Sequence, residues 1–105
     1  MESTFVCNMN ALNAVERERY KQLIERLNEN RQSIKELNDG YAFRYKADTR
    51  LIQEVAEFIA YERLCCPFFD FELAVEQDTN RLWLRLRGQD GVKEFIRDEF
   101  GIEEG

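Results

Sequence analysis

The sequence predicts an α+β domain with two layers, in which two hairpins form an antiparallel four-stranded sheet with helices on one face. Three segments carry apolar residues at helical spacing, and four others alternate apolar and polar residues as half-buried strands do. Short polar turns join the strands in two pairs, which gives the order α-ββ-α-ββ-α. Hairpins that are each followed by a helix favour a sheet with one covered face.

The composition limits the classes of function. The 105 residues fit one domain, residues 1–105, whose first residues 1–12 form a polar arm. A net charge of -6, with acids and bases interleaved, argues against binding to nucleic acid or to an acidic membrane surface. No apolar run approaches the roughly 20 residues that cross a bilayer, and residues 1–5 lack the features of a secretory signal. We therefore expect a cytoplasmic protein.

The first helix is predicted to begin after Asn13, which can form a capping box with Glu16. Its end lies between residues 28 and 33. Its apolar stripe consists of Val15, Tyr20, Leu23, Ile24 and Leu27.

A hairpin over residues 34–46 follows, with its turn at Asn38-Asp39-Gly40. A two-residue turn sets Phe43 opposite Glu36, and a three-residue loop with a bulge sets it opposite Lys35. Both registers remain open.

The second helix is predicted to begin after Asp48 and to end near Cys65, because Pro67 cannot continue it. Its broad buried face consists of Leu51, Ile52, Val55, Ala56, Phe58 and Ile59.

The second hairpin has strands over residues 69–76 and 81–87. Pairing Glu76 with Arg81 also sets Glu72 against Arg85, Asp70 against Arg87 and Ala74 against Trp83. Phe71, Leu73 and Val75 then meet Leu82, Leu84 and Leu86 on the core face. Trp83 shares the outward face with the charges, where it either contacts a second copy of the chain or covers Ala74.

A last helix is predicted with Asp90 as its cap and Gly101 as its stop. Its buried stripe is Val92, Phe95 and Ile96, with Phe100 as a further candidate.

The junction at residues 61–69 is the place to look for a chemical site. The buried stripes of the second helix lead forward to Glu62 and Arg63, and then to Cys65 and Cys66. Charged groups in such positions lie at the rim of the core or inside it, and a buried charge needs a partner.

The cysteines set the chemistry that is open to this junction. There are three, and two are adjacent, a spacing that rarely forms a relaxed disulfide. We therefore expect free thiols in a reducing compartment. The chain has no histidine, so proton transfer would fall to a carboxylate, thiolate, tyrosine or lysine, and a transition-metal site would rely on sulfur.

Several interpretations of the junction are open. Cys65 and Cys66 can be core fillers, with Glu62 and Arg63 tied to a strand or to Tyr41 or Tyr45. Alternatively Cys7, Cys65 and Cys66 hold zinc or another thiophilic ion, with Glu62 as a fourth ligand. Against the second interpretation, adjacent cysteines in a helix diverge by about 100°.

Two further interpretations involve other chemistry. A reactive thiol is opposed by the negative end of the helix dipole and by the lack of histidine, although Arg63 could offset the dipole. A small-molecule pocket could instead be lined by the aromatic side chains of Tyr41, Phe43, Tyr45 and Trp83.

Three elements resemble a group of small bacterial proteins of uncharacterised function. They lie at residues 39–44, at residues 82–86 and in the Glu-Arg-x-Cys-Cys-Pro-Phe element of residues 62–68. A later segment at residues 91–95 and the position of Cys7 are also similar to that group. The resemblance covers about two thirds of the chain and implies kinship without a mechanism.

These observations predict a protein that binds a thiophilic metal or metalloid through Cys7, Cys65 and Cys66. Tyr41, Tyr45 and Arg63 are predicted to lie beside the site. The alternative is a structural or protein-interaction module, a homodimer with Trp83 at its interface and buried structural cysteines. We expect no catalytic residues, no nucleic acid and no membrane partner.

Overall fold

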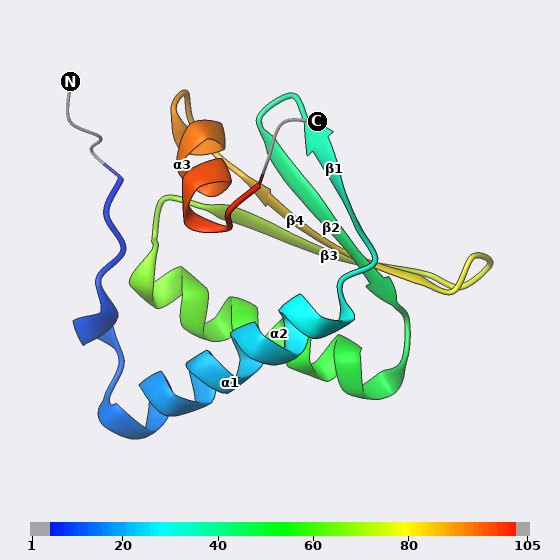
Figure 1. The fold of residues 1–105 in the computed structure, drawn as a ribbon, viewed down its shortest axis with the longest axis horizontal. Coiled ribbons are helices and arrows are strands. Elements are labelled where there is room, and N and C mark those ends of the chain that lie inside the picture. Colours follow the sequence, from blue (N-terminus) through cyan, green and yellow to red (C-terminus); the bar gives the residue numbers. More distant parts are fainter. Residues whose placement is uncertain (1–4, 103–105) are drawn as a thin grey trace.

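The computed structural model describes residues 5–102 and confirms the α+β fold (Figure 1). One antiparallel sheet has the strand order β1-β2-β4-β3, so the two hairpins meet through β2 and β4. Residues 1–4 of the predicted arm lie outside the described residues. The elements are the 3-10 helix η1 (Met9–Ala11), α1 (Ala14–Asn30), β1 (Ser33–Leu37), β2 (Gly40–Lys46), α2 (Thr49–Cys65), β3 (Asp70–Glu76), β4 (Arg81–Arg87) and α3 (Val92–Glu99).

The long helices begin at the predicted caps. Asn13 and Glu16 form the capping box of α1, and Asp48 Oδ1 accepts the Leu51 N–H of α2 at 2.7 Å. The helix α2 ends at Cys65, before Pro67, as predicted. Local sequence signals therefore determine where both helices start and where α2 stops.

The helices α1 and α2 lie side by side over one face of the sheet, and α3 packs on the same face (Figure 1). Two bidentate ion pairs join α1 to α2, Arg19 with Glu57 and Arg26 with Glu54. The sheet contributes Tyr41, Phe43, Tyr45, Leu82, Leu84 and Leu86 to the core, and the helices contribute Leu23, Leu27, Leu51, Val55, Phe58, Val92 and Ile96.

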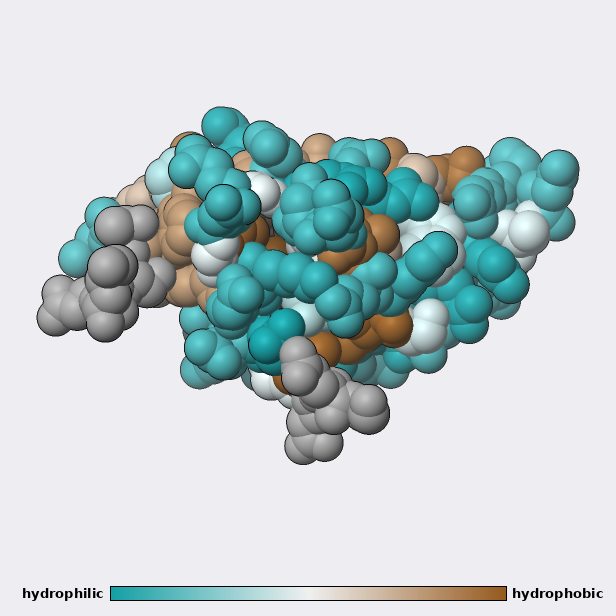
Figure 2. Space-filling view, turned by 90° about the horizontal axis from the view of Figure 1, so that it is seen from above, coloured by the Kyte–Doolittle hydropathy of each residue, from teal (hydrophilic) through white to brown (hydrophobic). Residues whose placement is uncertain are grey.

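Two residues that were predicted to lie on the buried faces of the helices are exposed, so the prediction is wrong for them. Val15 of α1 is 80% exposed, and Ala56 of α2 is also exposed. Glu54 is buried instead, because Arg26 of α1 reaches across to its carboxylate. Seen from above, the molecule is covered mainly by hydrophilic side chains (Figure 2). None of the helices among residues 5–102 is long and apolar enough to cross a membrane.

The register of the second hairpin is confirmed at every predicted pair, with Glu76 opposite Arg81 and Ala74 opposite Trp83. Not every ion pair joins residues that lie directly opposite each other in the paired strands. Arg87 lies opposite Asp70, but its guanidinium bonds to Glu72 and to Asp39 of the other hairpin. This guanidinium therefore ties the two hairpins together.

Both registers considered for the first hairpin are wrong, because Phe43 pairs with Ile34. The turn consists of Asn38 and Asp39, and Gly40 is the first residue of β2 rather than part of the turn. A Cβ at Gly40 would overlap the carbonyl oxygen of Leu86. Gly40 is thus required by the close approach of β2 to β4.

The cap of α3 also differs from the prediction. Gly91, at φ 96°, precedes the helix, and Asp90 lies one position earlier. The predicted stop is confirmed, since Gly101 follows the helix end with φ 63°.

We predict that Gly40→Ala lowers the free energy of unfolding by about 1–3 kcal/mol, since the added methyl group must displace backbone atoms of β4. Chemical denaturation measures the loss. Lys35→Ala, at an exposed position of β1, is the control and should change stability by less than about 0.5 kcal/mol. Equal stability of the two variants would contradict this role of Gly40.

Candidate functional site

The segment before α1 folds back onto the end of α2. The Asn8 N–H donates to the Cys65 carbonyl oxygen at 2.8 Å, which satisfies one of the last carbonyls of the helix. The Phe5 ring packs on Phe68 at 4.9 Å and on Phe95 of α3 at 6.4 Å between ring centroids. Figure 1 shows this segment running past the end of the α1–α2 pair. Cys7 lies between these two anchors and is thereby carried to the cysteine junction.

Cys7 and Cys66 form a disulfide, with their Cα atoms 4.6 Å apart. The expectation of free thiols is therefore wrong for two of the three cysteines. Adjacency argues against a bond between Cys65 and Cys66, but it leaves either of them able to pair with a distant cysteine. The anchored arm supplies that distant partner.

Cys65 is the free cysteine among the described residues, and its side chain is fully buried. Burial raises the pKa of its thiol, and the nearby Glu62 carboxyl raises it further. Cys65 therefore stays a neutral thiol near neutral pH. The structure thus brings all three cysteines to one junction and gives them different chemical states.

Glu62 is the buried ionisable group at this junction, with 2% of its surface exposed. Its Oε1 accepts the Tyr20 O–H at 2.6 Å and lies 3.5 Å from Cys66 Sγ. Burial raises the pKa of Glu62 to about 7. The hydrogen bond from Tyr20 opposes that rise, and the charge of Glu99 adds to it. The carboxyl group is therefore poised to exchange a proton near neutral pH.

Tyr20 is the site residue that sequence reasoning assigned only to the core. It comes from α1 and stacks on Phe58 of α2, with ring centroids 5.9 Å apart. Burial and the Glu62 charge raise the pKa of its hydroxyl far above the ordinary value, so it remains a donor. A signal was present in the sequence, because Tyr20 is the one hydroxyl on the apolar stripe of α1.

The other predicted neighbours lie elsewhere. Arg63 is exposed, so only Glu62 of the charged pair enters the core. The Tyr41 hydroxyl accepts a hydrogen bond from Arg97 of α3 at 3.1 Å. Tyr45 lines a cavity beside α1. The tyrosine that binds the Glu62 carboxyl is Tyr20 rather than Tyr41 or Tyr45.

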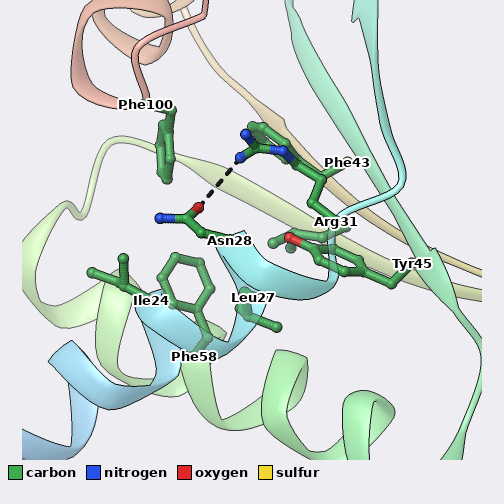
Figure 3. Close-up of a pocket in the computed structure, with 9 residues that line it drawn as sticks. Ile24, Leu27, Asn28, Arg31, Phe43, Tyr45, Phe58 and Phe100 are labelled. Atoms are coloured by element: carbon green, nitrogen blue, oxygen red, sulfur yellow. Dashed lines mark hydrogen bonds between the residues drawn. The ribbon is translucent and has the colours of Figure 1, made fainter.

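That cavity encloses about 20 Å³, the space of a single water molecule (Figure 3). Arg31 stands at its side, hydrogen-bonded to Asn28 and placed over the Phe43 ring. Phe43 and Tyr45 are the two members of the predicted aromatic pocket that contribute to it. A space of this size does not hold an organic ligand. Its lining is Ile24, Leu27, Asn28, Arg31, Phe43, Tyr45, Phe58, Leu84 and Phe100.

Trp83 is engaged within its own hairpin. Its indole N–H donates to Glu76 at 3.1 Å, and the Arg85 guanidinium lies 5.6 Å from the ring centroid. It also pairs with Ala74 in the register. An interface role for Trp83 stays a prediction.

Among residues 5–102, no three or more Cys, Asp or Glu side chains are arranged to hold a metal ion in this disulfide state. The two bonded sulfurs and the Glu62 oxygen nevertheless lie together. Reduction would free two thiols beside that carboxyl group.

Comparisons with known protein families, with curated proteins and with solved structures find no match to this chain. The resemblance carried by the Glu-Arg-x-Cys-Cys-Pro-Phe element therefore stays a prediction.

We predict that Glu62 makes the stability of the oxidised protein fall with rising pH. Its pKa is about 7 when folded and near 4.5 when unfolded, so the native state binds more protons between these values. This contribution is fully present below pH 4.5 and is lost as pH rises through 7, an effect on the order of 3 kcal/mol.

Denaturation of wild type and Glu62→Gln at a series of pH values measures this effect as the difference between the two proteins. The amide keeps an acceptor for Tyr20 but does not ionise, so its stability should change less over this range. Parallel pH profiles for the two proteins would contradict the assignment.

Proposed function

We propose that the protein binds a thiophilic metal or metalloid ion when the disulfide is reduced, through Cys7 and Cys66 with Glu62 as an oxygen ligand. The observation that carries the proposal is the return of Cys7 from the N-terminal arm to Cys66, directly beside the Glu62 carboxyl. The disulfide is the ion-free state. Cytoplasmic location is part of the proposal, since a reducing compartment maintains the dithiol.

The distances fit a small tetrahedral ion. With metal–sulfur and metal–oxygen bonds of about 2.3 and 2.0 Å, two such ligands lie roughly 3.5 Å apart. Glu62 Oε1 lies 3.5 Å from Cys66 Sγ. The two sulfurs would have to move apart to about 3.8 Å after reduction. The arm that carries Cys7 can supply this adjustment, because Val6 and Asn8 on either side of it are exposed.

Charge balance favours an ion over an empty dithiolate. Two thiolates and a carboxylate in a buried site would repel one another and lack solvation, and a divalent cation supplies the missing positive charge. Binding would release protons from both thiols and from the protonated fraction of Glu62. The apparent affinity should therefore rise with pH.

The role of Cys65 separates two forms of this proposal. Its buried thiol lies one residue from Cys66, and its backbone carbonyl anchors the arm. Cys65 becomes a third sulfur ligand only if the helix end rearranges, because adjacent side chains in a helix diverge. The variant Cys65→Ser therefore tests whether the ion uses two sulfurs or three.

We predict that the reduced protein binds one equivalent of zinc or of phenylarsine oxide, a reagent that joins two thiols and releases water. Cys7→Ser and Cys66→Ser should each lower the zinc affinity by at least about tenfold, and Glu62→Gln should lower it by a similar factor. Competition with a chromophoric chelator measures zinc, and mass spectrometry measures the arsenical. The oxidised protein is the control and should bind neither.

Unchanged zinc affinity in Cys7→Ser would contradict the site. The structural alternative then gains support, in which the cysteines only tie the arm to the core. A homodimer would be excluded by sedimentation that shows a monomer over the micromolar range.

A further inference from the structure

We propose that the cavity beside α1 binds one small halide ion, chloride or bromide, held by the guanidinium of Arg31 and the hydroxyl of Tyr45. This site is separate from the cysteine junction and independent of the ion binding proposed there. Arg31 is the C-cap of α1, and Tyr45 belongs to β2. The bound anion therefore joins the helix layer to the sheet (Figure 3).

The Tyr45 hydroxyl is a buried donor that needs an acceptor. Only 3% of the surface of this residue is exposed, and no group among residues 5–102 forms a hydrogen bond with the hydroxyl. A buried polar group without a partner destabilises the fold. Tyr45 lines the cavity, and its hydroxyl points toward the side chains of α1 that line the same cavity (Figure 3). A species bound there receives this hydrogen bond.

Arg31 brings a positive charge to the same cavity. Its guanidinium donates to the Asn28 side-chain oxygen at 3.3 Å and lies 5.8 Å from the centroid of the Phe43 ring, and no carboxylate among residues 5–102 forms an ion pair with it. Its remaining N–H groups are therefore available to an anion. The charge also reaches the second donor, because burial raises the pKa of Tyr45 to about 12 and Arg31 opposes that rise.

The lining of the cavity favours an anion over a cation or a water molecule. Among the described residues that line it there is one arginine and no Asp or Glu, and most of the others are apolar. A hydrogen bond from a guanidinium to an anion is stronger than one to a neutral acceptor, and apolar walls strengthen it further. The negative end of the α1 dipole opposes an anion, but it amounts to about half an elementary charge, whereas Arg31 carries a full one.

The size of the cavity limits the ligand to a single small ion. A volume of about 20 Å³ holds one water molecule, and a chloride or bromide ion is only slightly larger. Sulfate, phosphate and carboxylates have several heavy atoms and exceed this space. The rings of Phe43, Phe58 and Phe100 form much of the wall, so the ion is enclosed mainly by aromatic side chains.

The first test measures urea unfolding of the oxidised protein in EDTA, while sodium chloride replaces sodium gluconate at constant ionic strength. Gluconate is too large for the cavity, so the difference between the two anions reports the site. Once the chloride concentration exceeds the dissociation constant, each tenfold rise should raise the folding equilibrium constant about tenfold, as one bound ion requires.

The variants Tyr45→Phe and Arg31→Gln should each weaken the apparent chloride affinity by about tenfold or more, because each removes a hydrogen-bond donor to a charged ligand. Arg81→Gln is the matched control. It removes an exposed arginine that does not line the cavity, so it should keep the chloride dependence of the wild type.

A second measurement locates the ion without any variant. Crystals soaked in sodium bromide should show an anomalous scattering peak in the cavity, within hydrogen-bond distance of the Tyr45 hydroxyl and the Arg31 guanidinium. Equal chloride dependence of the wild type and folded Tyr45→Phe, or only water in the cavity of the soaked crystals, would overturn the proposal. Metal is absent and the disulfide intact throughout, so neither result bears on ion binding at the cysteine junction.

Discussion

The hydrogen bond between Tyr20 and Glu62 is the contact on which the cysteine junction depends. A carboxyl group buried at the end of α2 needs a polar partner, and α1 provides it. The stacking of Tyr20 on Phe58 holds that partner in place. The same oxygen, Oε1, accepts the Tyr20 hydrogen bond and faces the Cys66 sulfur. One atom therefore takes part both in the contact between α1 and α2 and in the contact with the disulfide.

Three carboxyl groups of α2 show how their surroundings shift the pKa of the same side chain in opposite directions. Glu54 and Glu57 each accept a bidentate bond from an arginine of α1, which holds the pKa of both below the ordinary value. Glu62 receives a neutral hydroxyl instead, and burial raises its pKa to about 7. The two carboxylates that pair with arginine join α1 to α2 and remain ionised. Glu62, on the same helix, can instead gain or lose a proton near neutral pH.

The sequence predicted well what depends on local pattern. The caps at Asn13 and Asp48, the end of α2 before Pro67 and the charged hairpin register each follow from a few neighbouring residues. The predicted registers of the first hairpin were wrong because Gly40 packs closely against β4, a strand distant in sequence. At the cysteine junction, too, a local pattern indicated one residue, whereas a nonlocal contact determined its partner. Glu62 stood out as a polar group on an apolar stripe, while its partner Tyr20 lies 42 positions away.

The pairing of Cys7 with Cys66 could not be predicted, because the arm is held by contacts with no sequence signature. The Asn8 N–H binds a helix carbonyl, and Phe5 joins a ring cluster with Phe68 and Phe95. Both contacts join residues far apart in the chain, and no local sequence pattern indicates either of them.

Those same anchors determine how the junction behaves once the disulfide is reduced. The disulfide joins residues 59 positions apart, and in the chain-entropy view such a link stabilises the native state by roughly 4 kcal/mol. Reduction removes that link but leaves the Asn8 hydrogen bond and the Phe5 packing, which are independent of sulfur chemistry. While they persist, Cys7 stays close to Cys66 at a high effective concentration. The proposed ion binding by the dithiol and its reoxidation would both require that proximity, so the noncovalent anchors of the arm would matter as much to the proposed site as its cysteines.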